Sequence, residues 1–295
     1  MENKRPFFSI IIPTYNHGHL IKRCLDSIVA QTYPYWEAII VNNFSKDNTV
    51  EVVENYQDER IRLVNNANHG IIAASRNKGL ELAQGDWICF LDSDDWWRED
   101  KLETCLPFLE HYDFLYHDLA VCQNGKMTGK VMRGRDLDKK DFIADILLSG
   151  NPIANSSTVI RRAIVDTVGF LTENHHLVAV EDVDYWLRIM TCTDRVKYIP
   201  LALGYYWMGT NISQKLTHIS KEKALLAKYI GCLSEEQAKI ARKVLSYKIA
   251  RLYHSNKCYH KAVGFYFNSI TTATDLKYLI NPIMGIALSL FHIRK

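Results

Sequence analysis

The sequence predicts an α/β fold in which a largely parallel, twisted sheet carries flanking helices, followed by a helical C-terminal segment. Three observations predict it. In the first 120 residues, short apolar runs typical of buried strands alternate with stretches whose apolar residues recur at helical spacing. Clusters of polar residues follow these strands, at the sheet edge where such folds bind ligands. Beyond residue 215 the strand signals give way to helical ones.

The first half of the chain is expected to contain successive strand and helix pairs. Residues 8–12 form an apolar run that Pro13 ends, which is typical of a buried strand. Further strands are expected over residues 36–41, 61–64, 86–91 and 114–117. Helices are expected between them, over residues 20–29, 49–57 and 71–83 and from about residue 99.

The second half begins with a polar, basic and glycine-containing stretch at residues 123–140, which we expect to be a loop. A second α/β stretch is expected from there to about residue 213. The segment from Ser234 to Gln237 has the pattern of a capping box and predicts the start of a helix. The last apolar run, residues 278–293, contains Pro282 and is shorter than the ~20 residues that a membrane-spanning helix needs.

The seven cysteines are widely scattered and include no CxxC pair. This spacing argues against a disulfide framework and against a structural zinc site, and it favours a reducing cytoplasm. The apolar run near the N-terminus is too short for the core of a signal peptide. We therefore expect a cytoplasmic protein.

Charge is divided unevenly along the chain, whose formal net charge is +3. Residues 215–295 hold 14 Lys and Arg against four Asp and Glu, whereas residues 1–214 hold 22 against 29. The acidic part should bind cations and the basic part should favour anionic partners. The basic part leaves two interpretations open: contact with an anionic membrane surface, or a packed helical region with a solvated basic face. No nucleic-acid-binding motif accompanies it, so nucleic acid is not an expected partner.

An acidic turn follows the apolar run that ends at Leu91. Asp92, Asp94 and Asp95 lie within four positions, where their charges repel one another and raise one another's pKa. A hard cation such as Mg²⁺ or Mn²⁺ relieves that repulsion, and it can also bridge a diphosphate. The alternative is that the acids begin a helix and favour its dipole. We expect that alternative for Asp95 and metal binding for Asp92 and Asp94.

A second acidic group comprises Glu181, Asp182 and Asp184. A carboxylate here could act as a general base, but acids at the start of a helix are also common because they complement its dipole. Residue types alone favour the helix start.

Four further segments form a pattern: SIIIPTYN at residues 9–16, NHG with ASRNKG at residues 68–79, FLDSDD at residues 90–95 and VEDVDYWLR at residues 180–188. Together they resemble the family 2 nucleotide-sugar glycosyltransferases with the GT-A fold, and FLDSDD resembles the DxD motif of that family. The resemblance covers about residues 7–215, and the four motifs occur in the family's order. It implies a glycosyltransferase domain over residues 1–215, with a nucleotide-sugar-binding half at 1–120 and an acceptor-binding half at 121–215. Residues 216–295 form the basic helical region.

The resemblance also implies which residues bind the donor. Pro13, Thr14 and Tyr15 match the segment that cradles base and ribose, although Tyr15 could instead be a buried core aromatic. Arg76 matches a residue that meets donor phosphate or base; the alternative is a solvated helix face. In the DxD motif, the implied nucleotide contacts are Asp92 and Ser93, and the implied ligands of Mn²⁺ or Mg²⁺ are Asp92 and Asp94.

One position departs from the family pattern. Two aspartates are common where this chain has Asn42 and Asn43, and the second would accept the N3–H of uracil. The amide oxygen of Asn43 can still accept that hydrogen, and its NH₂ group can also donate. A neutral partner forms a weaker hydrogen bond than a carboxylate. UDP is therefore the default nucleotide, and dTDP or another base stays open.

On the acceptor side, the resemblance assigns the general base to Asp182 and the orientation of the acceptor to Glu181, while Asp184 begins the helix. The family often has a metal-binding histidine near the end of this region, but residues 205–213 contain none. His218 is the nearest candidate in sequence, and the adjacent His175 and His176 are expected in an exposed loop.

These features predict an inverting, metal-dependent glycosyltransferase that moves a sugar from a nucleotide-sugar to a hydroxyl of a glycan acceptor. With the basic C-terminal region, the resemblance implies a polyprenyl-diphosphate-linked acceptor in O-antigen, lipopolysaccharide or capsule assembly, and a peripheral location at the inner face of the cytoplasmic membrane. The alternatives are a nucleotidyltransferase, although its glycine-rich phosphate loop is missing, and a catalytically inactive nucleotide-sugar-binding protein. The presence of Asp94 and Asp182 counts against the inactive protein.

Overall fold

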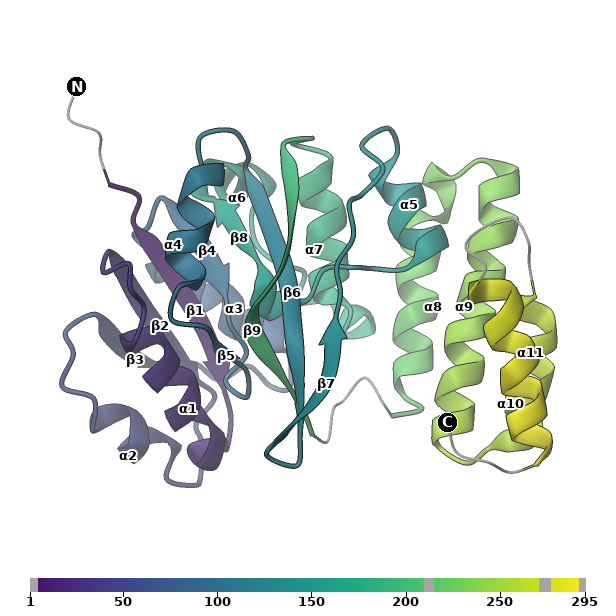
Figure 1. The fold of residues 1–295 in the computed structure, drawn as a ribbon, viewed down its shortest axis with the longest axis horizontal. Helices are drawn as coiled ribbons and strands as arrows, with labels where there is room; N and C mark the ends of the chain where they lie inside the picture. The colour runs from purple at the N-terminus through teal and green to yellow at the C-terminus, as the bar shows by residue number, and fades with distance from the viewer. Residues whose placement is uncertain (1–4, 210–214, 271–276, 292–295) are drawn as a thin grey trace. The chain divides into compact units, whose positions relative to one another are not determined.

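The computed structural model describes residues 5–209, 215–270 and 277–291, and the chain forms two compact units (Figure 1). The first unit comprises Met1–Asp136, Pro152–Glu173 and Tyr185–Gly209. The second comprises Leu137–Asn151, Asn174–Asp184 and Thr210–Lys295.

A nine-stranded sheet forms the centre of the first unit. Its strand order is β3-β2-β1-β4-β8-β6-β9-β5, and β7 pairs with β6. The strands are β1 (Phe8–Thr14), β2 (Trp36–Asn42), β3 (Ile61–Asn65), β4 (Trp87–Phe90), β5 (Trp96–Trp97), β6 (Phe114–Gln123), β7 (Lys126–Met132), β8 (Val159–Arg161) and β9 (Val196–Met208). The first four strands are parallel to one another, as predicted, and β8 runs antiparallel to both β4 and β6.

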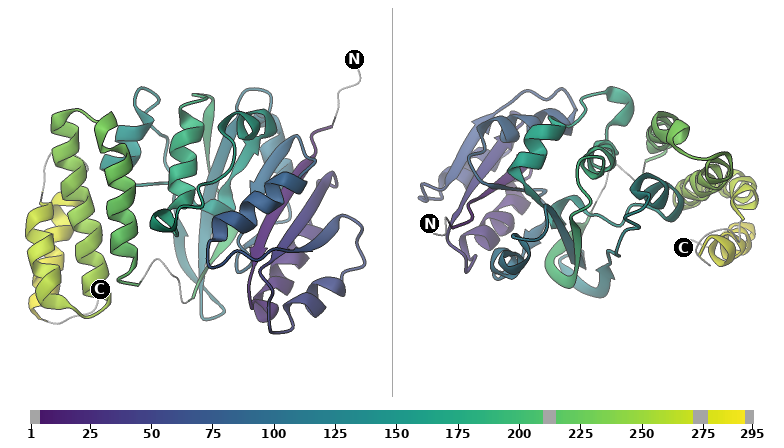
Figure 2. Two further views of the ribbon diagram at one scale, coloured as in Figure 1. Left: turned by 180° about the vertical axis from the view of Figure 1, so that it is seen from behind. Right: turned by 90° about the horizontal axis from the view of Figure 1, so that it is seen from above.

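Helices cover both faces of this sheet, as views from opposite sides show (Figures 1 and 2). Helices in or entering the first unit are α1 (Gly18–Val29), α2 (Thr49–Glu54), α3 (Ile72–Leu82), α4 (Lys101–Cys105), α6 (Arg162–Val168) and α7 (Glu181–Met190). Every residue of β1 is buried because both of its faces are covered. Ile10 and Ile12 belong to one apolar cluster with the inner face of α1 and with Leu102 of α4. On the other face, α3 lies so close that a Cβ on Gly79 would come within 2.4 Å of the Ile11 side chain.

Residues 126–132 correct one expectation, because they form the strand β7 and not a loop. This strand forms a hairpin with β6 through Asn124 and Gly125, which both have positive φ angles of 51° and 73°. Asn-Gly is the preferred pair for such a two-residue turn. Most β7 side chains are exposed, and the strand lacks the continuous apolar run that marked the buried strands.

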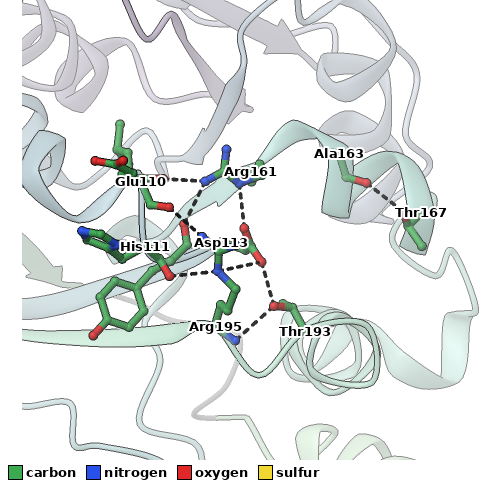
Figure 3. Close-up of polar contacts among 10 residues, drawn as sticks. Glu110, His111, Asp113, Arg161, Ala163, Thr167, Thr193 and Arg195 are labelled. Carbon is green, nitrogen blue, oxygen red and sulfur yellow. Dashed lines mark hydrogen bonds and ion pairs between the residues drawn. The ribbon is translucent and has the colours of Figure 1, made fainter.

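A polar cluster fastens the start of β6 to its neighbours (Figure 3). The carboxylate of Asp113 accepts hydrogen bonds from Arg161 Nε at 2.7 Å and Thr193 Oγ1 at 2.8 Å, and Arg195 Nε lies 3.7 Å from it. The Arg161 guanidinium also lies 4.5 Å from the centre of the Trp87 ring. Asp113 is largely buried, and charge-assisted bonds of this kind hold the strand ends in register.

The second unit is helical. Its helices are α5 (Phe142–Ser149), α8 (His218–Tyr229), α9 (Glu235–Ser255), α10 (Tyr259–Ser269) and α11 (Lys277–Leu290), together with the first turn of α7. The predicted capping box is confirmed at the start of α9, where Ser234 and Gln237 each bond the other's backbone amide. A core that includes Tyr247, Tyr266 and Tyr278 joins α9, α10 and α11. Among the described residues, no helix is both long enough and apolar enough to cross a membrane.

Candidate active site

The carboxyl ends of the first four strands bring four loops together. Backbone hydrogen bonds continue beyond the strands, from Asn43 N–H to the Thr14 carbonyl at 2.9 Å and from Leu91 N–H to the Ile11 carbonyl at 3.1 Å. The loops after β1 and β2 are also joined through Asn16, whose side-chain oxygen accepts the Lys46 N–H at 2.8 Å. Asn16 has a φ of 53°, a conformation that asparagine tolerates better than most residues. The four loops therefore form one polar edge of the sheet, as predicted.

The segment Pro13–Tyr15, which was expected to bind the base and ribose, has both buried and exposed residues. Pro13 and Thr14 are buried, while the side chain of Tyr15 is 48% exposed. Tyr15 is therefore not a core aromatic, and its ring is accessible to a ligand at the strand end.

Asn42 and Asn43 have different surroundings. Asn42 is buried, and its side chain bonds Asn65 and Ser45. The side-chain oxygen of Asn43 accepts the backbone N–H of Asn68 at 3.0 Å. A backbone N–H can only donate, so this contact fixes the oxygen toward Asn68 and turns the NH₂ group of Asn43 away from it.

Asp92 is held by two donors on the same oxygen. Its Oδ1 accepts hydrogen bonds from Arg76 Nη2 and from Asn155 Nδ2, both at 2.9 Å. Arg76 is only 4% exposed, so the alternative of a solvated helix face is wrong. Within the part of the chain that the structure describes, Oδ2 of Asp92 accepts no hydrogen bond, which leaves it available to a ligand.

Asp94 lies beside Asp92 in a partly buried position. Burial and, second, the charge of Asp92 raise the pKa of Asp94 to about 7. Arg23 opposes this shift, and its Nη2 donates to the backbone carbonyl of Asp94 at 2.9 Å. The same guanidinium lies 3.5 Å from the centre of the Trp96 ring, a cation–π geometry that fixes it in place.

Asp95 has a different role from the one expected. It precedes the short strand β5 and not a helix, since α4 begins only at Lys101. Its buried carboxylate accepts Ser156 Oγ at 2.6 Å and the Trp207 N–H at 2.8 Å, which ties the acidic turn to β9. Burial, together with the charges of Asp94 and Asp92, raises the pKa of Asp95 well above its usual range.

Ser93 connects the acidic turn to the loop after β1. It is buried, and its hydroxyl lies 2.8 Å from Nδ1 of His17. Burial and the neighbouring His19 lower the pKa of His17, while the charge of Asp92 opposes this shift. The contact fixes the middle of the acidic turn against the start of α1.

The open carboxylate oxygens of Asp92 and Asp94 fit a hard divalent cation. The raised pKa of Asp94 shows that its negative charge is not balanced by nearby positive charge, and a bound cation would balance it. Residues 5–209, 215–270 and 277–291 contain no cluster of three or more His, Cys, Asp or Glu side chains placed to hold a metal. Mg²⁺ and Mn²⁺ sites commonly use one or two carboxylates, with phosphate and water completing the shell. Two carboxylates at this edge are therefore sufficient.

The second acidic group lies in the first turn of α7 and belongs to the second unit. Asp184 is fully buried there and accepts hydrogen bonds from Lys228 and from the Tyr229 hydroxyl, so it anchors α7 to α8. Glu181 is buried as well. Asp182 is partly buried, and its Oδ1 accepts the N–H of Val183 at 2.8 Å. Of these three acids, Asp182 is thus the one most open to a substrate.

The three histidines that were considered in the sequence, His175, His176 and His218, also lie in the second unit. His218 Nε2 is 3.4 Å from Glu222 Oε1, and Lys248 Nζ is 2.8 Å from the other oxygen of Glu222. His175 and His176 are exposed in a short 3₁₀ turn, as expected. Of the stretch 205–213, which lacks histidine, residues 210–213 lie outside the described residues.

The acidic turn is supported by residues from other segments, which were not predicted from the sequence. Asn155 and Ser156, in a buried 3₁₀ turn, contact Asp92 and Asp95, and Arg23 comes from the middle of α1. The run NSS at residues 155–157 is polar and precedes a strand, which was the one available signal. Neither segment lies near the acidic turn in sequence.

The profile of the family described as "Glycosyl transferase family 2" matches residues 9–168. Three relatives have named roles. A putative teichuronic acid biosynthesis glycosyltransferase, TuaG of Bacillus subtilis, is 43% identical over 37% of this chain and 44% of its own length, so this match spans less than half of that relative. WfgD of Escherichia coli, a UDP-Glc:alpha-D-GlcNAc-diphosphoundecaprenol beta-1,3-glucosyltransferase, is 32% identical over 62% of this chain and 69% of its own. The amylovoran biosynthesis glycosyltransferase AmsB of Erwinia amylovora is 34% identical over 70% of this chain and 72% of its own.

Solved structures with the same fold include S. aureus TarS in complex with UDP. It has a TM-score of 0.63 and 19% identity, and the alignment covers 98% of this chain and 89% of that chain. The mannosyltransferase PcManGT from Pyrobaculum calidifontis, in complex with GDP-Man and Mn²⁺, has a TM-score of 0.60 and 17% identity and covers 98% of this chain and 81% of its own. At these identities the likeness concerns the fold. Together with the profile match and the order of the four motifs, it shows that the chain belongs to glycosyl transferase family 2 and has the GT-A fold.

Proposed function

We propose that this protein is an inverting glycosyltransferase, which moves a sugar from a nucleotide-sugar donor to a hydroxyl of a glycan acceptor during cell-surface polysaccharide biosynthesis. The observation that carries the proposal is the pair of open carboxylates, Asp92 and Asp94, at the carboxyl end of β4. Family membership and the named roles of TuaG, WfgD and AmsB support the reaction class.

The donor is proposed to bind across the loops after β1, β2 and β4. Tyr15 would stack on the base, Pro13 and Thr14 would shape the floor beneath base and ribose, and Asn43 would contact the base edge. UDP is the default nucleotide, supported by the solved TarS complexes with UDP and UDP-GlcNAc. Ser93 and Asp92 would meet the ribose and diphosphate, with Arg76 holding Asp92 in place.

Asp92 and Asp94 are proposed to hold Mn²⁺ or Mg²⁺, which when bound would neutralise the diphosphate as it departs. The Mn²⁺ complex of PcManGT supports this assignment. Arg23 fixes the backbone of Asp94, and Asn155 fixes the carboxylate of Asp92. The two proposed metal ligands are therefore oriented before the donor binds.

Asp182 is proposed as the general base. As the acceptor oxygen attacks C1 of the sugar, the bond from C1 to the diphosphate oxygen breaks and the acceptor proton passes to the Asp182 carboxylate. A single displacement of this kind inverts the configuration at C1. Glu181 would orient the acceptor, and Asp184 would keep the first turn of α7 in place through Lys228 and Tyr229.

The acceptor is proposed to be a polyprenyl-diphosphate-linked glycan in O-antigen or capsule assembly. The name of WfgD specifies a diphosphoundecaprenol acceptor, which supports this class. Such an acceptor lies in the membrane, so the protein would work at the inner face of the cytoplasmic membrane as a peripheral protein, with its basic C-terminal region toward anionic lipid.

A donor screen tests the proposal. The purified protein is incubated with Mn²⁺ and each common nucleotide-sugar, and release of the nucleoside diphosphate is measured with and without a diphosphoundecaprenol-linked sugar. We expect one donor to give release that depends on the acceptor. Release of pyrophosphate from a nucleoside triphosphate and a sugar phosphate, without activity on any nucleotide-sugar, would instead identify a nucleotidyltransferase.

A further inference from the structure

Helix α11 has two faces of different character. Its inner face consists of Tyr278, Pro282, Gly285 and Ser289, all buried and spaced at three or four residues. Gly285 lies so close to Tyr266 of α10 that a Cβ would come within 2.4 Å of its ring, and Ser289 bonds His254 of α9 at 2.8 Å. The helix is therefore fixed within the second unit by contacts along one side.

The outer face of α11 and its last turn are apolar. Between residues 278 and 291, the exposed side chains are Ile280, Ile283, Met284, Ala287, Leu290 and Phe291. The five larger ones are 46% to 76% exposed, and the segment contains no charged residue. A helix on the surface of a globular protein normally turns polar residues to solvent, so a contiguous apolar face marks a surface that meets an apolar partner.

We infer that this outer face of α11 is a membrane-contact surface, which lies in the plane of an anionic lipid bilayer. A helix of 14 residues is about 21 Å long at 1.5 Å per residue, shorter than the hydrocarbon core of a bilayer, so it lies along the surface and does not cross. Insertion of the apolar side chains to the depth of the headgroup boundary removes them from water.

Charge identifies lipid, and not a second copy of this chain, as the occupant. Residues 235–295, counted from the start of α9, hold ten Lys and Arg against three acids, Glu235, Glu236 and Asp275. Exposed cations on the helices that pack with α11 are Lys239, Arg242, Lys243 and Arg251 of α9 and Lys261 of α10, and the exposed Lys257 lies in the turn between these two helices. Two such regions repel each other, whereas anionic headgroups attract each basic residue near the surface.

The purpose of this membrane contact rests on the proposed function, because a polyprenyl-linked acceptor lies in the same bilayer. The contact itself needs neither donor nor acceptor, so it can be measured alone. A failure of vesicle binding and a failure of sugar transfer are therefore separate results.

The test is co-sedimentation of the full chain with phosphatidylglycerol–phosphatidylcholine vesicles. Ile283→Asp and the double variant Ile283→Asp/Leu290→Asp should each lower the partition coefficient at least about tenfold, because a charge replaces an exposed apolar group that inserts into the bilayer. Leu201→Asp is the matched control, since Leu201 is 48% exposed on β9 of the first unit, and it should bind as the wild type does. Wild-type binding should weaken on neutral phosphatidylcholine vesicles and at high salt.

Two results would overturn the inference. One is unchanged vesicle binding by the double variant, with circular dichroism and UDP affinity showing that it is folded. The other is light scattering that finds a wild-type dimer in the absence of lipid, converted to a monomer by Ile283→Asp, because the face would then bind a second copy.

Discussion

Replacing Asp94 with asparagine should stabilise the protein above pH 7 in the presence of a chelator, although it removes a proposed metal ligand. In the folded chain, burial and the charge of Asp92 raise the pKa of Asp94 from an ordinary 3.8 to about 7. Between these two values the folded state binds a proton that the unfolded state does not. The free energy of unfolding therefore falls as pH rises through this window.

The size of the effect follows from the shift. One pKa unit corresponds to about 1.4 kcal/mol, so a shift of about three units amounts to at most about 4 kcal/mol. Asp94 is only partly buried and shares its surroundings with the charges of Asp92 and Asp95, which reduces the expected gain to about 1–3 kcal/mol at pH 8. At pH 4 the wild-type carboxyl is already protonated, and the gain should be close to zero.

Urea unfolding of wild type and Asp94→Asn at pH 4, 6 and 8 with chelator present measures this difference. If the stability gain of Asp94→Asn over the wild type grows with pH, the negative charge of Asp94 is not balanced by nearby positive charge. Mn²⁺ with UDP should then stabilise the wild type but not the variant. A difference that does not depend on pH, or a variant less stable than the wild type at pH 8, would refute the reasoning.

Three further predictions concern other residues. Asp182→Asn should lower turnover ~10²–10⁴-fold with donor affinity unchanged, while Glu181→Gln should chiefly raise KM for the acceptor. Steady-state kinetics, with calorimetry of donor binding, measures both effects. Loss of turnover in Glu181→Gln alone would show that the two roles are reversed. Asn43→Asp should favour UDP and dTDP over CDP in competition binding, because a carboxylate accepts N3–H; an unchanged ranking would mean that Asn43 does not face the base. Burial alone would raise the pKa of Glu222, but Lys248 and hydrogen bonds from it and His218 lower it to about 2. Glu222→Gln should therefore destabilise the chain by about 1–3 kcal/mol at pH 7 and lose this effect as pH falls from 4.5 through 2, and an equal loss in urea unfolding at both extremes would contradict the ion pair.

The sequence was most informative where a strand is buried on both faces. Continuous apolar runs such as residues 8–12 predicted β1, β2 and β4, because covered strands need apolar side chains on both sides. β7 was missed for the converse reason, since an edge strand with exposed side chains keeps a polar composition. Its Asn-Gly turn was a usable signal for the hairpin.

The candidate site was predictable where its chemistry lies in one segment. Three acids ending a strand indicated a cation, and Asp92 and Asp94 do keep open positions. Asp95 was assigned to a helix start because local sequence does not show that its partners, Ser156 and Trp207, come from elsewhere in the chain.

Burial of a charged residue was equally hard to predict. Arg76 lies on α3, where an arginine is more often solvated, and only the fold brings Asp92 within 2.9 Å of it. The orientation of the Asn43 amide likewise depends on the backbone of Asn68, which is 25 residues away.

Calorimetric titration of UDP into the wild type and Asp94→Ala, each with Mn²⁺ and with chelator, tests the central claim most directly. The proposed site predicts that the wild type binds UDP at least about tenfold more tightly with Mn²⁺, because two carboxylates and the diphosphate share the cation. Asp94→Ala should bind weakly and equally under both conditions. Wild-type affinity that is unchanged by chelator would contradict a metal-bridged donor at Asp92 and Asp94.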